Sequence, residues 1–150
     1  MYILISGGFD PLHSGHLRAF EEASKIGRLV VAVNSDNWLI RKKKSFLLPS
    51  WERANLIKQL KSVYAVLDDW DDSDGTACDA IQFFYSEYKH TNLPLIFANG
   101  GDRTAVGSNA AENAVCESLG IYTMYGLGGG KTTSSSDYLA SYIKRISNNA

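Results

Sequence analysis

Cysteine is scarce in this sequence, which contains only Cys78 and Cys116. Two thiols do not make a disulfide framework, and these two lack the paired spacing of a zinc site. The sequence therefore excludes a disulfide-stabilised fold and a cysteine-based metal centre. Both cysteines are expected to be buried side chains without a chemical role.

An excess of basic charge is also missing, because 15 lysines and arginines stand against 16 acidic residues, for a net charge of −1. Proteins that bind nucleic acid or membranes over their whole surface usually need such an excess. The sequence has no run of about 18 apolar residues, and Met1 leads directly into a strand-like segment instead of a basic leader. We therefore expect a soluble cytoplasmic protein without nucleic-acid or membrane partners.

Repeats, linkers and low-complexity segments are absent from the sequence as well. Its 150 residues, of which 45% are hydrophobic, are enough for one core and too few for two. Residues 1–150 are therefore predicted to form a single domain.

Strand-like and helix-like patterns alternate along the whole sequence. Residues 29–33 form a continuous apolar run, which is typical of a strand buried on both faces, whereas Leu17, Phe20 and Ala23 repeat at helical spacing. Strands joined by helical crossovers give a parallel sheet that helices cover on both faces. We predict a doubly wound α/β fold with a five-stranded parallel sheet. The expected strands are 2–6, 29–33, 63–67, 95–98 and 121–125, and the expected helices are 14–26, 50–59, 76–90, 109–119 and 134–146.

Polar, mostly glycine-rich segments follow four of the expected strands, at the edge where ligands bind in a doubly wound sheet. The first of them, residues 7–16, reads Gly-Gly-Phe-Asp-Pro-Leu-His-Ser-Gly-His. Glycines let the backbone come close to a ligand, and a helix N-terminus favours phosphate. His13 and His16 lie on one side of the first helical turn, where each imidazole can donate a hydrogen bond to phosphate. This junction therefore predicts a site for a nucleoside triphosphate.

The segment from Phe9 to His16 resembles the signature of nucleotidyltransferases that carry a His-x-Gly-His motif. It is most similar to their small cytidylyltransferase-like branch, which includes glycerol-3-phosphate cytidylyltransferase and the heptose-phosphate adenylyltransferase domain. Further similarities follow in the family's order at residues 32–36, 52–53, 100–102 and 134–136. The resemblance implies a Rossmann-like nucleotidyltransferase fold. It also implies that a substrate phosphate attacks the α-phosphorus of a nucleoside triphosphate and that pyrophosphate is released.

The resemblance further implies the partners of the reaction. CTP is the first expectation for the donor and ATP the second, with Mg²⁺ carried by the triphosphate and no metal ligand assigned to the protein. The expected acceptor is a small phosphorylated polyol or sugar. Together with the strand-rich edges, the resemblance suggests a homodimer.

Roles for individual residues also come from the resemblance. His13, His16 and Lys44 are expected to be catalytic, and Lys42 and Arg53 are expected to hold the acceptor phosphate, because a guanidinium can grip phosphate through two bonds. Serine hydroxyls and free backbone N–H groups at the start of the last helix would form a further anion site. Gly15 is expected to leave room for the nucleotide. The residues assigned to nucleotide binding are Gly8, Phe9, Asp10, Ser14, Gly15, Asp102, Lys131, Ser134, Ser135 and Ser136.

Two positions depart from the family pattern and leave the substrate open. Lys131 lies where the glycerol-phosphate enzymes have an arginine, and Arg103 lies where an aromatic residue is common. An adenylyltransferase that uses ATP on a sugar phosphate is one alternative, and a non-catalytic nucleotide-binding module is another. Residues 126–132, Gly-Leu-Gly-Gly-Gly-Lys-Thr, also resemble the P-loop of a kinase or ATPase, but they are one residue short of its spacing.

Overall fold

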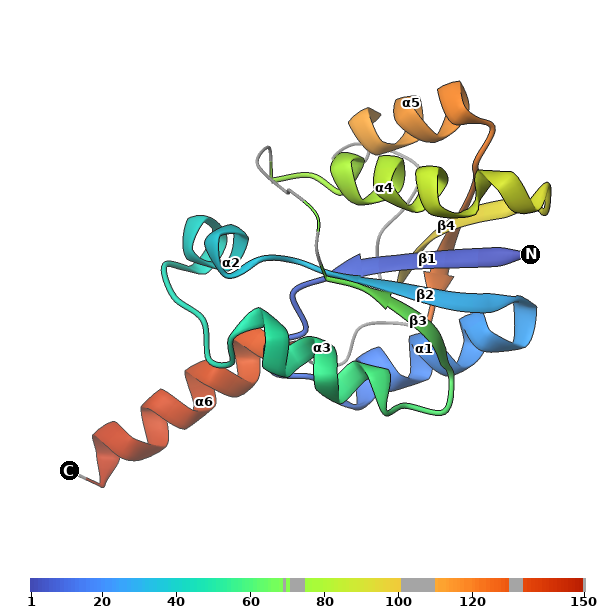
Figure 1. Ribbon diagram of the computed structural model, residues 1–150. Coiled ribbons are helices and arrows are strands. Elements are labelled where there is room, and N and C mark those ends of the chain that lie inside the picture. The colour runs from blue at the N-terminus through green and yellow to red at the C-terminus, as the bar shows by residue number, and fades with distance from the viewer. Residues whose placement is uncertain (69, 71–74, 101–109, 130–133, 150) are drawn as a thin grey trace.

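The computed structural model describes residues 1–68, 70, 75–100, 110–129 and 134–149 (Figure 1). Its strands are β1 (Tyr2–Gly7), β2 (Arg28–Val33), β3 (Val63–Leu67), β4 (Leu95–Gly100) and β5 (Tyr122–Leu127). Its helices are α1 (Ser14–Ile26), α2 (Asp36–Lys43), α3 (Ser50–Lys58), α4 (Cys78–Tyr88), α5 (Ala110–Leu119) and α6 (Ser135–Asn148), with a short 3₁₀ turn, η1 (Lys89–Thr91).

The five strands form one sheet in the order β3-β2-β1-β4-β5, and every neighbouring pair is parallel. The chain starts in the central strand and adds strands first on one side and then on the other. The prediction of a doubly wound α/β fold with a five-stranded parallel sheet is therefore confirmed. In this order the connections after β1 and β4 diverge to opposite sides, which opens a crevice at the carboxyl edge of the sheet.

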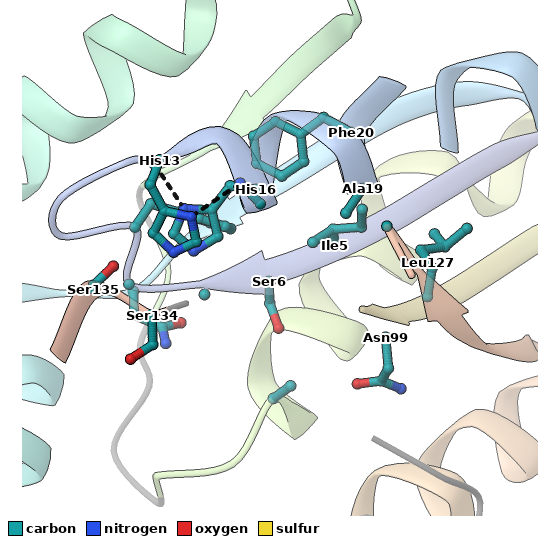
Figure 2. A pocket seen from close by; sticks show the side chains of 18 of the residues that line it. Ile5, Ser6, His13, His16, Ala19, Phe20, Asn99, Leu127, Ser134 and Ser135 are labelled. Carbon is teal, nitrogen blue, oxygen red and sulfur yellow. Dashed lines mark hydrogen bonds between the residues drawn. The ribbon is translucent and has the colours of Figure 1, made fainter. Parts of the chain in front are cut away.

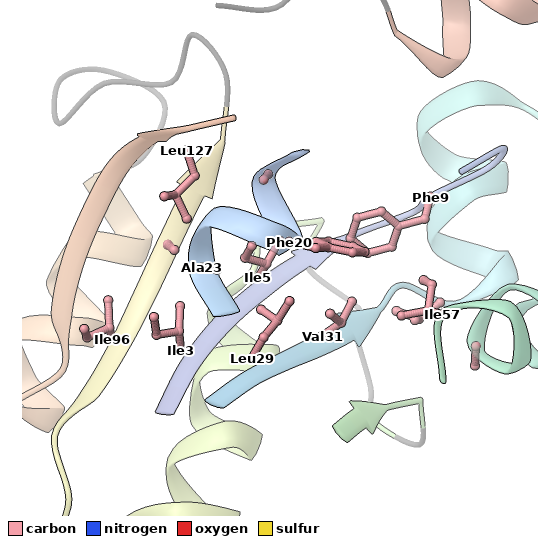
Figure 3. Close-up of a cluster of buried hydrophobic side chains, with 14 residues drawn as sticks. Ile3, Ile5, Phe9, Phe20, Ala23, Leu29, Val31, Ile57, Ile96 and Leu127 are labelled. Atoms are coloured by element: carbon pink, nitrogen blue, oxygen red, sulfur yellow. The ribbon is translucent and has the colours of Figure 1, made fainter. Parts of the chain in front are cut away.

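Helices cover both faces of the sheet, as Figure 1 shows, with α1 and α3 on one face and α4 and α5 on the other. The core under α1 and α3 is drawn in Figure 3, where Phe20 of α1 and Ile57 of α3 meet Ile3, Leu29 and Val31 of the central strands. On the opposite face, a second cluster of buried side chains packs α4 and α5 against the sheet. Burial on both faces explains the apolar runs of the central strands β1 and β2, whereas the edge strands β3 and β5 are partly exposed.

Helix α2 is the element that the sequence analysis did not predict. Its N-cap is Ser35, whose Oγ accepts a hydrogen bond from the backbone N–H of Trp38 at 3.0 Å. Its second half consists of Arg41 and the lysines that follow it, a charged run with little helical periodicity of apolar residues. The side chain of Leu39 alone is buried in the core, so the helix is short and lies at the rim of the crevice.

Helix α6 differs from the other helices because it projects from the body of the protein (Figure 1). Ser135 is its only buried residue among those described. No helix in the described parts of the chain is both long enough and apolar enough to cross a membrane.

Candidate active site

A pocket of about 520 Å³ lies at the carboxyl ends of the strands. Its floor is formed by the ends of β1 and β4 and by Leu127 of β5, and its walls come from α1, α2 and the start of α6. Figure 2 shows the two histidines and the serines at one end, with Ser6 and Asn99 across from them. The predicted site residues that line it are Gly8, Phe9, His13, Gly15, His16, Lys42, Ser134, Ser135 and Ser136.

The histidine pair begins helix α1. His13 is the N-cap residue, and its Nδ1 accepts a hydrogen bond from the backbone N–H of Gly15 at 3.1 Å. The backbone N–H of His13 in turn donates to Nδ1 of His16 at 3.2 Å, which completes a reciprocal capping arrangement. A nitrogen that accepts a hydrogen bond carries no proton, so the proton of each neutral ring is on Nε2. The local backbone therefore sets both histidines as Nε2–H donors.

The two imidazole rings are stacked, with centroids 3.7 Å apart and planes 25° from parallel. Phe9, which has a left-handed backbone (φ 53°), is buried and contacts the ring of His16 edge-on at 5.0 Å. Gly15 makes room for this arrangement, because a Cβ there would lie 2.9 Å from Cε1 of His13. The open side of Gly15 is thus filled by the ring of His13, and room for a nucleotide at Gly15 stays a prediction.

The start of α6 forms the wall beside the histidines. Ser134 is its N-cap, and the hydroxyl oxygen accepts a hydrogen bond from the N–H of Asp137 at 3.1 Å. The Ser135 hydroxyl donates to the carbonyl of Pro11 at 2.7 Å, and the ring of Tyr138 lies 5.8 Å from that of His13. The serine segment is therefore attached to the loop that carries the histidines, although it follows more than a hundred residues later.

Helix α2 supplies cations and an indole to the opposite wall. Lys42 and Lys43 both line the pocket, and Nζ of Lys42 lies 5.4 Å from the ring centroid of Trp38. Within the described part of the chain, the buried Nε1 of Trp38 has no hydrogen-bond partner. Lys44 is the C-cap of α2, with a left-handed backbone (φ 70°), and does not line the pocket. The pocket thus receives Lys42 and Lys43 from the end of a helix, and the catalytic role of Lys44 stays a prediction.

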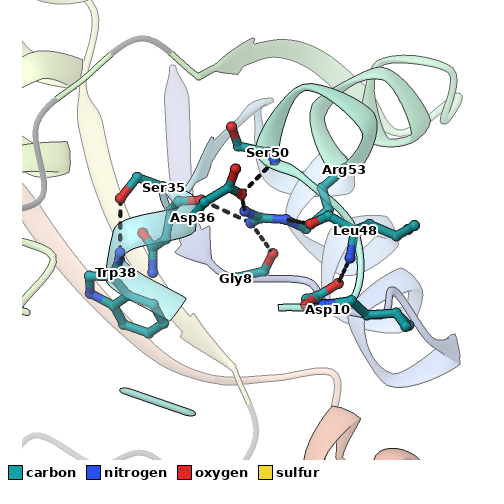
Figure 4. A network of polar contacts seen from close by, with 10 residues as sticks. Gly8, Asp10, Ser35, Asp36, Trp38, Leu48, Ser50 and Arg53 are labelled. Atoms are coloured by element: carbon teal, nitrogen blue, oxygen red, sulfur yellow. Dashed lines mark hydrogen bonds and ion pairs between the residues drawn. The ribbon is translucent and has the colours of Figure 1, made fainter. Parts of the chain in front are cut away.

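Arg53 lies outside the pocket lining, in a network of polar contacts that joins several loops (Figure 4). Its side chain is fully buried, and its Nη1 donates to the carbonyls of Gly8 at 2.7 Å and Asn34 at 2.8 Å. Nε donates to the carbonyl of Leu48, and Nη2 forms an ion pair with Asp36, both at 2.8 Å. The guanidinium therefore ties the loops after β1 and β2 to α3. The structure gives it this structural role, and contact with an acceptor phosphate stays a prediction.

Asp10 has a comparable role in the same network. Its buried carboxylate accepts hydrogen bonds from the backbone N–H groups of Leu47 at 2.6 Å and Leu48 at 2.8 Å. It lies outside the pocket lining, as does the exposed Ser14. Asp102, Lys131 and Arg103 are outside the described residues.

Sequence reasoning missed several pocket residues. Glu112 is buried, and its Oε1 accepts a hydrogen bond from the N–H of Ala77 at 3.0 Å, which joins α5 to the start of α4. An acidic residue in a helical pattern is normally a solvated one, so its position in the sequence gave no signal.

Burial, followed by the charges of Glu112 and Cys78, raises the pKa of the Cys116 thiol to about 12. The other missed lining residues with polar or charged groups are Ser6, Arg18, Asn34, Trp38, Lys43, Thr76 and Asn99.

Among the described residues, no group of three or more His, Cys, Asp or Glu side chains is placed to hold an ion. The polar groups identified at the pocket wall are mainly cations and N–H donors, which suit phosphate oxygens.

Two named proteins are similar in sequence to parts of this chain. Ethanolamine-phosphate cytidylyltransferase of Arabidopsis thaliana is 30% identical over 114 residues, which are 72% of this chain and 27% of that protein. FAD synthase of Methanopyrus kandleri is 40% identical over 65 residues, 41% of this chain and 43% of that protein. The chain thus spans about a quarter of the first relative's length and less than half of the second's.

A solved structure matches over most of the fold. The lipopolysaccharide core biosynthesis protein from Thermoplasma volcanium GSS1 superposes with a TM-score of 0.65 at 25% identity, over 87% of this chain and 98% of that chain. The sequence model of the cytidylyltransferase-like family matches residues 4–133, a range that includes both histidines, most of β1 and the other four strands but ends just before α6. The chain therefore belongs to the cytidylyltransferase-like family.

Proposed function

We propose that residues 1–150 form a nucleotidyltransferase domain that activates a small phosphorylated molecule. In this reaction, an oxygen of the acceptor phosphate attacks the α-phosphorus of a nucleoside triphosphate. The bond between the α-phosphorus and the oxygen that bridges to the β-phosphate breaks, and pyrophosphate leaves with its electron pair. The observation that carries the proposal is the stacked histidine pair, in which both Nδ1 atoms are occupied by backbone N–H groups.

The histidines would act on the charge that develops during the reaction. Phosphoryl-type transfer requires little covalent help, so positioning and electrostatic stabilisation supply most of the rate. Two Nε2–H donors on neighbouring rings, held by helix capping and by Phe9, are preorganised for the α- and β-phosphate oxygens. His13 and His16 therefore retain the catalytic role expected from the sequence.

The two pocket walls would each bind one substrate, the nucleotide donor on one side and the acceptor phosphate on the other. Ser136 and the first backbone N–H groups of α6 lie beside the histidines and suit the β- and γ-phosphates. Lys42 and Lys43 on α2 suit the acceptor phosphate, with the Trp38 N–H as a further donor. Lys44 as a catalytic residue, and Asp102 and Lys131 at the nucleotide, remain predictions. Mg²⁺ enters as part of the nucleotide, which is in effect the magnesium salt of CTP or ATP.

The acceptor is proposed to be a phosphorylated polyol, amino alcohol or sugar. Similarity to ethanolamine-phosphate cytidylyltransferase covers more of this chain than similarity to FAD synthase, and it favours CTP with a small acceptor. A pocket of about 520 Å³ also suits one nucleotide with a small partner better than two nucleotide-sized molecules. The second candidate is an adenylyl transfer like that of FAD synthase, because identity with that relative is higher within the shared segment.

Pyrophosphate release tests the proposal and separates these candidates. The purified protein would be incubated with each triphosphate and Mg²⁺ in combination with phosphoethanolamine, glycerol 3-phosphate, sugar phosphates or FMN. We expect release with CTP and one of the small phosphates. Release only with ATP and FMN would favour the second candidate. Saturable nucleotide binding without release for any pair would indicate a non-catalytic binding module.

A further inference from the structure

The pocket has two chemically different sides, because it extends over both faces of the sheet. Ile5 of β1 and Ala98 of β4 belong to the core that α1 covers. Successive side chains of a strand point to opposite faces, so the next residues, Ser6 and Asn99, point to the face that α4 and α5 cover. Figure 2 shows both side chains on the side of the strands away from Phe20. The pocket is therefore apolar over α1 and polar over α4 and α5.

Glu112 of α5 brings a negative charge to the polar side. Its side chain lines the pocket and is only 4% exposed. Its Oε1 accepts the hydrogen bond from the N–H of Ala77, the N-cap residue of α4, at 3.0 Å. A carboxylate has about four lone-pair sites, of which this bond uses one. Four side chains on this side form what we call the polar subsite: Ser6, Thr76, Asn99 and Glu112.

The polar subsite adjoins the lysines of α2. A Cβ on Gly75 would lie 3.9 Å from Cε of Lys42, so the lysine side chain passes close to the start of α4. Gly75 is two residues before Ala77, whose N–H binds Glu112, and two residues of chain span at most about 7 Å. The lysines proposed for the acceptor phosphate and the Glu112 carboxylate are therefore within reach of one small molecule.

The apolar side of the pocket suits the base of the nucleotide better. It is lined by Ala19 of α1 and by Leu127 and Gly128 at the end of β5. A flat base is bound well between apolar side chains and glycine backbone. With the base on the apolar side, the polar subsite is left to the acceptor.

The groups of the polar subsite suit hydroxyls better than an ammonium group. A carboxylate only accepts hydrogen bonds, whereas the amide of Asn99 also has two N–H donors. A ligand hydroxyl can donate to Glu112 and accept from Asn99. An ammonium group has three donors and no acceptor, so it can bind Glu112 but not the amide N–H groups. Sites that hydrogen-bond a substrate hydroxyl strongly reject analogues that lack it.

We propose that Asn99 and Glu112 determine acceptor specificity by binding hydroxyl groups at the end of the acceptor remote from its phosphate. They select a hydroxylated phosphate over an amino alcohol phosphate, and so decide between acceptor classes that the proposed function leaves open. The identity of the bound molecule as the acceptor rests on the proposed function. The binding preference itself does not.

Calorimetry without nucleotide measures this preference. Glycerol 3-phosphate and phosphoethanolamine are a matched pair, because both carry one phosphate and differ in having two hydroxyls or one ammonium group. Hexose 1-phosphates extend the hydroxylated series. We expect the wild type to bind at least one hydroxylated phosphate ten times more tightly than phosphoethanolamine. Tighter or equal binding of phosphoethanolamine, or no binding of any of these compounds, overturns the proposal.

Two substitutions of nearly unchanged size test the residues. Glu112→Gln keeps an oxygen for the N–H of Ala77 and is expected to weaken binding of the preferred hydroxylated phosphate about tenfold. Asn99→Asp removes the amide donors and adds a second carboxylate. It is expected to weaken binding of that phosphate and to strengthen binding of phosphoethanolamine, a pair of opposite changes that a general loss of structure does not produce.

Glu117→Gln is the matched control, because Glu117 is an exposed carboxylate on the same helix. Its affinities are expected to equal those of the wild type. Unchanged binding of the hydroxylated phosphate in both Glu112→Gln and Asn99→Asp overturns the assignment of these residues.

Pyrophosphate release separates this proposal from the proposed function. Selective binding without release for any pair of substrates refutes the proposed function and leaves the polar subsite in place. Faster release with phosphoethanolamine than with every hydroxylated phosphate overturns the polar subsite and leaves nucleotidyl transfer in place. In Glu112→Gln we expect KM to rise for the acceptor and not for the nucleotide. An equal rise in both KM values overturns the assignment to the acceptor.

Discussion

The imidazole rings of His13 and His16 are stacked 3.7 Å apart, and backbone N–H groups occupy Nδ1 of both rings. One residue pair therefore caps a helix and presents two Nε2–H donors to the pocket. A proton on either Nδ1 would point at the backbone N–H that donates to this atom, so the capping hydrogen bond would be lost. The arrangement holds both rings in one orientation before a nucleotide binds.

Replacing His16 separates its two roles. His16→Ala removes the Nε2–H donor and the acceptor for the His13 N–H, so we expect kcat to fall by about 10²- to 10³-fold and the free energy of unfolding by about 1 kcal/mol. In His16→Asn, a side-chain oxygen can replace Nδ1 but no group replaces Nε2. Urea denaturation should show recovered stability in this variant without recovered kcat. Recovery of both quantities would show that the ring acts only as a cap.

The indole of Trp38 is expected to bind the acceptor. The residue lines the pocket and its buried Nε1 has no hydrogen-bond partner among the described residues, so we expect a ligand oxygen to accept this hydrogen bond. Trp38→Phe keeps an aromatic ring and removes the N–H. Steady-state kinetics should show KM for the acceptor raised about tenfold, with KM for the nucleotide unchanged. Equal changes in both KM values would indicate a purely structural role.

Arg53 is expected to govern stability more than substrate binding. Arg53→Lys retains the charge but cannot satisfy the carbonyls of Gly8, Asn34 and Leu48 together, so urea denaturation should show a loss of about 3 kcal/mol. Lys58 on the same helix is the control, because its exposed ion pair with Asp68 predicts a loss below about 1 kcal/mol for Lys58→Ala. A stable Arg53→Lys protein with a raised KM for the acceptor would instead place the guanidinium at the substrate.

The Cys116 thiol should be unreactive in the folded protein. Burial, then Glu112 and Cys78, raises its pKa to about 12 from an ordinary value of 9.0. The folded thiol stays protonated at pH 8.5, and we expect iodoacetamide to modify Cys116 only after unfolding. Since the unfolded thiol ionises first, the stability from this group is complete below about pH 9 and is lost as pH rises toward 12. Rapid native-state labelling, mapped by mass spectrometry, would contradict this environment.

The sequence predicted the parts of the fold that depend on simple periodic patterns. The apolar runs predicted all five strands, and the glycine-rich junction before His13 predicted that both histidines lie at the carboxyl edge of the sheet. Helix α2 was missed because it is short and ends in a charged run, and it is held by Ser35 and the Asp36–Arg53 ion pair. The Asp36–Arg53 ion pair joins residues 17 positions apart and leaves no local pattern.

The positions of charged residues were the hardest to predict, because charged side chains are usually exposed. Arg53 is fully buried under the loops that form the pocket, which its place in the sequence did not indicate, and its contact with an acceptor phosphate stays a prediction. Lys43 lines the pocket next to Lys42. Both lie in a helix, where neighbouring side chains can reach the same site, whereas in a strand they would point to opposite faces. The apolar residues of α6 follow a helical spacing in the sequence, but only the structure shows that Tyr142, Ile143 and Ile146 are exposed.

The fate of the phosphates tests the central claim most directly. The protein would be incubated with CTP or ATP labelled separately at the α- and γ-phosphorus, together with the acceptor that supports turnover. We predict that the α-label enters the acceptor product and that the γ-label leaves in pyrophosphate. Transfer of the γ-label to the acceptor, or its release as orthophosphate, would contradict nucleotidyl transfer and indicate a kinase or an ATPase.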